Sequence, residues 1–181
     1  MKKHSIPQFT FFQAPISNTI PKGIVSLLDI YNLIRTEYKN NTDLLRFIAE
    51  PAQARTFKAR HFDYVTFSGV FKKRSDKELI KHSGLLCLDF DHLDNLDFTK
   101  KLLVNDPYFE TELLFTSPSG KGLKWIIPIN IHKVTHAQYF QAVSNYLKHN
   151  YLIEPDKCGK DISRACFLCH DPNAFIHPKH L

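Results

Sequence analysis

The order of segments between Gly84 and Cys169 restricts the fold more than any other feature of the chain. Apolar runs typical of strands alternate there with runs of helical periodicity. The expected elements are strands over 84–91, 112–116, 123–129 and 163–169, and helices over 97–103 and 135–151. This βαββαβ order is that of the ferredoxin-like (RRM-like) α+β unit, which predicts a sheet with strand order 4-1-3-2. Another α+β sandwich is the alternative.

The residues before this core are predicted to form a flank of helices and a hairpin. The expected elements are helices over 24–38, 42–50 and 52–60, a strand over 64–71, and a short capped helix over 76–81. With 181 residues the chain is long enough for one domain and too short for two ordinary ones. We therefore expect a single domain, with a flanking subdomain over 1–75 and a core over 76–181.

Composition narrows the classes of partner. No apolar run approaches the roughly 20 residues that span a bilayer, so we expect no membrane partner. The chain begins with two lysines, but Pro7 and Pro15 interrupt the apolar stretch that follows. We therefore expect no export and a cytoplasmic location. The net charge of +6 suits a polyanionic partner such as nucleic acid, with DNA as the first expectation.

Two acidic residues end the first strand of the predicted core. Asp89 and Asp91 are two positions apart, so both side chains point to one face of the sheet, while Leu86, Leu88 and Phe90 point to the other. Two carboxylates on one face repel each other unless a cation lies between them. Hard oxygen ligands suit Mg²⁺ or Mn²⁺, so the pair predicts a divalent-metal site. An acid pair that only ends a strand is the alternative.

A loop rich in glycine and lysine follows the second strand. Gly120 and Gly122 allow backbone N–H groups to face an anion, Ser119 can donate a hydrogen bond, and Lys121 and Lys124 supply positive charge. This combination predicts a nucleotide-phosphate site. It is not a Walker A loop, because neither that spacing nor the helix that follows it is present. A hairpin turn with surface lysines is the alternative.

A third polar segment precedes the last predicted strand. Asp156 or Asp161 could complete a three-carboxylate metal site, and the sequence leaves both open. Arg164 could bind a phosphate through two hydrogen bonds. In a sheet of order 4-1-3-2, the three polar segments meet at one end of the central strands. We therefore predict one combined site for metal and phosphate.

These motifs resemble those of the archaeo-eukaryotic primase superfamily. The matching strings are L-D-F-D at 88–91, S-G-K-G-L-K at 119–124 and D-I-S-R at 161–164. Longer strings are similar to the VirE N-terminal domain family, a primase-like family of bacterial mobile elements, over about 25–175. These are V-T-F-S-G-V-F at 65–71, H-S-G-L-L-C-L-D-F-D at 82–91 and S-P-S-G-K-G-L-K at 117–124.

The resemblance implies a metal-dependent nucleotidyltransferase of primase-polymerase type, acting in DNA replication or mobile-element maintenance. It implies Asp89, Asp91 and Asp161 as catalytic residues, Mg²⁺ or Mn²⁺ as cofactor and a nucleoside triphosphate as substrate. It also implies a helicase or a helical primase-associated domain as a partner. The basic residues expected to bind nucleic acid are Arg55, Lys58, Arg60, Lys72, Lys73 and Arg74.

Two other functions remain open. The superfamily's second motif ends in His, where this chain has Lys124, and this departure favours a catalytically inactive nucleic-acid-binding module. A metal-dependent nuclease could use the same carboxylates. Structural zinc is a separate possibility, since Cys158, Cys166 and Cys169 lie near His170 and His177. Cys166 and Cys169 fall on opposite faces of the predicted strand, which argues against that centre.

Overall fold

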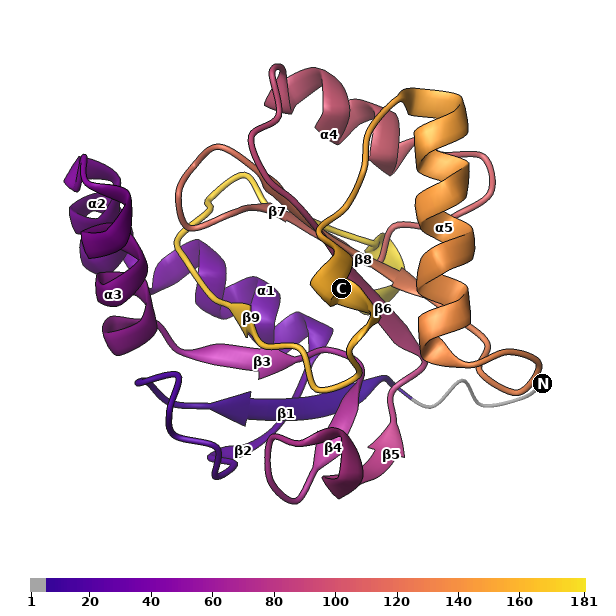
Figure 1. Cartoon of the computed structure of the whole chain (residues 1–181), viewed down its shortest axis with the longest axis horizontal. Coiled ribbons are helices and arrows are strands. Elements are labelled where there is room, and N and C mark those ends of the chain that lie inside the picture. The colour runs from indigo at the N-terminus through magenta and orange to yellow at the C-terminus, as the bar shows by residue number, and fades with distance from the viewer. Residues whose placement is uncertain (1–5) are drawn as a thin grey trace.

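The computed structural model describes residues 6–181, which form an α+β fold with two antiparallel sheets of four strands each (Figure 1). The first sheet has the order β2-β1-β3-β9 and the second β10-β7-β8-β6. Their strands are β1 (Gln8–Phe12), β2 (Gly23–Ser26), β3 (Tyr64–Thr66), β6 (Leu85–Phe90), β7 (Leu113–Thr116), β8 (Leu123–Pro128), β9 (Cys166–Phe167) and β10 (Phe175–Ile176). The expectation about the two N-terminal lysines lies outside the described residues.

Five α-helices and three short 3-10 helices complete the described part of the chain. The α-helices are α1 (Leu27–Thr36), α2 (Lys39–Phe47), α3 (Pro51–His61), α4 (Leu96–Val104) and α5 (His136–Tyr151). The remaining elements are the β4–β5 ribbon (Gly69–Phe71 and Leu79–His82) and the helices η1 (Asp76–Glu78), η2 (Lys157–Lys160) and η3 (Pro178–His180). None of the helices in residues 6–181 is long and apolar enough to cross a membrane.

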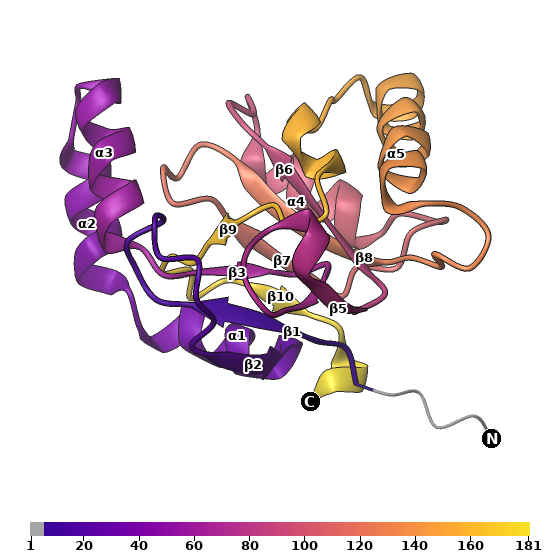
Figure 2. The ribbon, with the colours of Figure 1, turned by 60° about the horizontal axis from the view of Figure 1, so that its bottom comes forward.

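Strand β6 divides its side chains between two cores, as strand geometry requires. Leu86, Leu88 and Phe90 are fully buried in a core that α4 and α5 cover, which confirms their predicted direction toward helices. Leu85 belongs to a second core with residues of the first sheet and α1. Asp89 lies at the other parity from Phe90, so its side chain belongs to the face that the first sheet and α3 approach (Figure 2).

The fourth strand of the predicted core lies elsewhere than expected. Strands β6, β8 and β7 are neighbours in the order that a ferredoxin-like unit requires for its first, third and second strands. The segment predicted as the fourth strand forms the short β9, which pairs with β3 of the first sheet through Tyr64–Phe167 and Val65–Cys166. The order 4-1-3-2 is therefore not observed. Strand β9 also joins the expected flank to the expected core.

Several flank elements differ from the prediction. The segment expected as one helix over 24–38 is divided, because 23–26 pairs with β1 as an edge strand and Ser26 then caps α1 through a capping box. The helix expected over 76–81 is only the single turn η1, and β5 follows it and pairs with β4. Sequence inspection missed β1, although its Phe9 and Phe12 are fully buried.

Candidate functional site

Strand register places Asp89 opposite Lys124. The two residues are Cα partners on β6 and β8, so their side chains leave the sheet on one face. The Lys124 ammonium donates a hydrogen bond to Oδ2 of Asp89 and forms an ion pair with it. Burial lowers the pKa of Lys124, but the Asp89 carboxylate leads the effects that raise it, and the net direction is upward. Lys124 is therefore a buried cation with a carboxylate as its direct partner.

The third carboxylate of the acidic group comes from Asp156. Its backbone N–H donates to the Asp89 carbonyl over 2.7 Å, which fixes the start of η2 against the end of β6. One carboxylate oxygen from each of Asp89, Asp91 and Asp156 lies within 4.8 Å of the others. Among residues 6–181 this is the one group of three or more potential metal ligands so close together. Of the two open candidates for the third acid, Asp156 joins the pair and Asp161 does not.

The acidic group fits a hard divalent cation. Oδ1 of Asp89 is buried and has no hydrogen-bond partner among the described residues. Such an atom loses its hydration without compensation, and a cation would restore the lost interaction. Two oxygens on opposite sides of one Mg²⁺ lie roughly 4.2 Å apart, which is close to the 4.8 Å within which the three carboxylate oxygens lie. Asp89, Asp91 and Asp156 are the residues that would hold it.

Two hydrogen bonds fix the orientation of the Asp156 carboxylate. Its Oδ1 accepts from the Cys158 backbone N–H at 3.0 Å, and its Oδ2 accepts from the Arg164 guanidinium at 3.1 Å. Partial burial raises the pKa of Asp156, but these bonds and the charge of Arg164 outweigh burial, so the pKa falls below its ordinary value. The carboxylate therefore stays ionised at neutral pH.

A cavity of about 320 Å³ adjoins the acidic group. Its charged lining consists of Asp89 and Asp161 together with the cations Lys58, Arg74, Lys124 and Arg164. Nε of Arg74 is buried and has no partner among the described residues, so one strong donor in this lining is unused. Four cations against two acids in one cavity suit a ligand that carries several negative charges.

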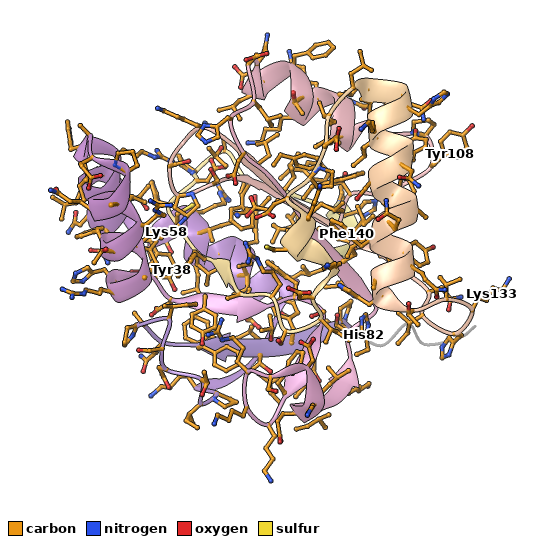
Figure 3. The ribbon with its side chains drawn as sticks, in the orientation of Figure 1. Tyr38, Lys58, His82, Tyr108, Lys133 and Phe140 are labelled. Carbon is orange, nitrogen blue, oxygen red and sulfur yellow. The ribbon has the colours of Figure 1, made fainter. Side chains whose placement is uncertain are left out.

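Two elements of the first half of the chain supply half of these cations. Arg74 follows β4, donates through Nη2 to the Ile16 carbonyl at 3.0 Å, and stacks 5.1 Å above the Tyr64 ring. Lys58 projects from α3 toward the middle of the molecule, 5.4 Å from the Phe167 ring (Figure 3). Burial and then the charge of Lys124 lower the pKa of Lys58. Both residues were expected to bind nucleic acid, and both line the cavity instead.

The other four basic residues expected to bind nucleic acid do not line the cavity. Arg55 and Arg60 are exposed on α3, and Lys72 and Lys73 are exposed on the turn that follows β4. They therefore remain a solvated basic surface near the cavity lining, because Lys58 and Arg74 belong to the same two segments.

The glycine-lysine loop is divided between two places. Lys124 reaches the cavity, whereas Gly120 and Lys121 line a different hollow of about 480 Å³ formed with residues 92–97. Ser119 is exposed, and its Oγ lies 3.1 Å from that of Ser117. The loop as a whole therefore does not surround the cavity next to the acids. Of the loop residues that were predicted to form a single phosphate cradle, Lys124 alone lines the cavity.

Gly122 is required by the close approach of the loop to β6. A Cβ atom at this position would lie 2.0 Å from the carbonyl oxygen of Phe90, a distance that no side chain tolerates. Gly120 has a positive φ of 75°, and a Cβ atom there would lie 3.1 Å from Nε of Arg46, which donates to the Pro118 carbonyl. The glycines thus shape the loop and bring Phe90, and Asp91 after it, to the loop's base.

The cysteines do not form the zinc centre that their spacing allows. No group of three or more close ligands that includes Cys158, Cys166 or Cys169 occurs in the part of the chain that the structure describes. Cys166 instead contacts Cys87 of β6, and this hydrogen bond together with burial raises the pKa of the Cys87 thiol well above its usual value. The Cys87 thiol is therefore protonated at neutral pH, and Cys166 and Cys169 are buried members of the core.

Two histidines, His82 and His136, contact each other, and His136 also contacts η2. Nε2 of His82 and Nδ1 of His136 lie 3.2 Å apart, and Nε2 of His136 lies 3.3 Å from the Gly159 carbonyl. Burial, then the neighbouring His136, lowers the pKa of His82 to about 4. Sequence inspection missed this pair, because the residues are distant along the chain and neither belongs to a motif.

Comparison with known proteins gives one result. The family model of the BT4734-like N-terminal domain matches residues 56–175. No curated protein and no solved structure matches the chain. The assignment to the VirE N-terminal domain family and its primase superfamily, suggested by the motifs, was therefore wrong, because the match is to a different family. The chain belongs to the BT4734-like N-terminal domain family.

Proposed function

We propose that the chain is a divalent-metal-dependent nucleotidyltransferase, which joins nucleotides to a 3′-hydroxyl as primases and polymerases do. The observation that carries the proposal is the contact between the acidic group and the cationic cavity. Asp89 belongs to both: its carboxylate is one of three that could hold a cation, and it also lines the cavity. A metal site beside a polyanion site is the arrangement that phosphoryl transfer requires.

The roles of the residues follow from their positions. Asp89, Asp91 and Asp156 would hold Mg²⁺ or Mn²⁺, and a bound ion supplies Lewis acidity that lowers the pKa of an attacking hydroxyl. Lys58, Arg74 and Arg164 would bind the triphosphate through charge-assisted hydrogen bonds and stabilise the charge that develops in transfer. Asp161 lines the same cavity and would orient the nucleotide there.

The exposed basic residues on α3 and after β4 extend this proposal to a nucleic-acid strand. Arg55, Arg60, Lys72 and Lys73 are free to contact phosphates of DNA without competing for the cavity. The cavity also bears on the rival functions. Lys58, Arg74 and Arg164 in its lining suit a triphosphate, for which a nuclease has less use. The carboxylate oxygen of Asp89 that has no partner suits a metal, for which an inactive binding module has no need.

Calorimetry with a non-hydrolysable nucleoside triphosphate and Mn²⁺ tests the proposal. The Asp89→Ala/Asp91→Ala double variant should lose metal-dependent binding. Asp156→Asn should weaken it by at least about tenfold, because even the loss of a residue that only supports a metal ligand costs about 10- to 100-fold in metal affinity. Asp161→Asn is the matched control for metal binding and should keep the affinity for Mn²⁺ alone. Binding of the nucleotide by the double variant as tightly as by the wild type would defeat the proposal.

Primer extension then separates the remaining possibilities. A labelled primer–template should become longer when Mn²⁺ and nucleoside triphosphates are both present. Shortening of the labelled strand without any triphosphate would identify a nuclease, and retention of the strand without change in length would identify a binding module. Either result would reject the nucleotidyltransferase.

A further inference from the structure

The Lys124 ammonium is bound to Asp89, a carboxylate that also belongs to the acidic group. Its side chain is 10% exposed and that of Asp89 is 18% exposed, so the ion pair is formed largely away from water. Asp89 is the hydrogen-bond partner that the structure gives to the Lys124 ammonium among the described residues. An ammonium so deeply buried cannot leave its carboxylate without a large desolvation cost. Lys124 is therefore a permanent member of the acidic group.

Because Lys124 binds one oxygen of Asp89, the two carboxylate oxygens have separate roles. Oδ2 accepts from Lys124, and Oδ1 is the buried atom that has no partner among the described residues. Asp89 can thus offer one oxygen to a metal ion. In a centre that holds two ions about 3.5–4 Å apart, a carboxylate that gives one oxygen to each ion must have both of its oxygens free. With Lys124 in place, Asp89 cannot form such a bridge.

The charge of the group leads to the same conclusion. Asp89, Asp91 and Asp156 carry three negative charges, while Lys124 and Arg164 are paired with two of them and contribute two positive charges. The remaining charge of about minus one attracts a divalent ion, and one bound ion already reverses it to about plus one, which disfavours a second ion. Without Lys124 the group would carry about minus two.

We propose that Lys124 takes the place of the second ion of a two-metal centre, so that this protein binds a single divalent cation. The ammonium supplies a fixed positive charge on Asp89, and one ion completes the site between Oδ1 of Asp89, Asp91 and Asp156. This inference rests on the proposed function, because it assumes that the acidic group binds a metal. It adds the stoichiometry of the metal and a role for Lys124.

A titration of the full chain with Mn²⁺ alone, followed through the electron paramagnetic resonance signal of the free ion, tests the inference. The wild type should bind one ion. Lys124→Met removes the charge, keeps a side chain of similar length, and should bind two ions. Lys133→Met is the matched control, because Lys133 is exposed and lies on the opposite side of the molecule from Lys58 in Figure 3. It should bind one ion.

Each outcome decides the question. Two ions in the wild type, or one in Lys124→Met, would overturn the inference and leave the proposed function intact. No bound Mn²⁺ in the wild type would overturn both. Lys124→Gln provides a second, polar replacement, and circular dichroism reports whether each variant is folded. If neither folds, the wild-type stoichiometry alone decides, since one ion supports the inference and two reject it.

Discussion

Arg74 gives the sharpest test of the cavity as a phosphate site. Its Nε is a buried donor with no partner among residues 6–181, while Nη2 donates to the Ile16 carbonyl at 3.0 Å. We expect Arg74→Met to weaken binding of a nucleoside triphosphate by roughly 10- to 100-fold, because a hydrogen bond to a charged group contributes about 1.5–3 kcal/mol. Binding of Mn²⁺ alone should not change, since Arg74 is no part of the acidic group.

The same substitution should have little effect on the stability of the unliganded protein. The variant loses the hydrogen bond to Ile16, worth about 1 kcal/mol, and the stacking on Tyr64, worth about 0.5–1 kcal/mol. It also removes the unpaired buried Nε, which costs the wild type about 1–3 kcal/mol. These effects nearly cancel, so we expect the free energy of unfolding to change by less than about 1 kcal/mol.

Calorimetry and urea denaturation measure the two quantities, and Arg35→Met is the matched control. Arg35 also lies above a tyrosine ring, at 5.0 Å from that of Tyr31, but it is exposed on α1 and is not part of the cavity lining. The control should bind the nucleotide as the wild type does. Unchanged nucleotide affinity in a folded Arg74→Met would refute the assignment of the cavity to phosphate.

Two further predictions concern the framework. Gly122→Ala should destabilise the fold by about 3 kcal/mol in urea denaturation, because its Cβ would meet the Phe90 carbonyl, whereas Gly23→Ala, with nothing within 4 Å, should not. The pKa of His82 is lowered to about 4. As pH falls below about 6.5, His82 is therefore protonated in the unfolded chain and stays neutral in the folded protein, which favours unfolding. The free energy of unfolding should fall by about 1 kcal/mol between about pH 7 and pH 5, after discounting for partial exposure. In His82→Gln this loss should be absent from the pH dependence of unfolding, and an unaltered slope would contradict the reasoning.

The local character of most elements could be predicted from sequence because it depends on neighbouring residues. Strand parity alone placed Leu86, Leu88 and Phe90 against the helices, and the structure confirms this. The capping box at Thr135 marks the start of α5 where the sequence indicated a helix. The α+β class follows from such local patterns.

The pairing of β9 could not be predicted in the same way. Two residues of β9 pair with β3, and nothing in so short a segment distinguishes this partner from β6. The sequence predicted that Asp156 meets Asp89 because a fourth strand would lie beside β6. In the structure the two residues meet because η2 begins at the end of β6. The sequence indicated that the segments with Asp89, Lys124 and Arg164 meet, and these residues do line one cavity. It did not indicate that Lys58 and Arg74 join them, because their arrival depends on packing between the two halves of the chain.

The division of the site between the two halves of the chain limits how such domains can be recombined. The cations Lys58 and Arg74 precede residue 75, whereas Asp89, Asp91 and Asp156 follow it, and β3 and β9 join the two halves in one sheet. A chimera with its crossover near residue 75 would therefore take two of the four cavity cations from one parent, and the other two together with the acidic group from the other parent. Exchange between homologues should preserve function only when both halves are inherited together.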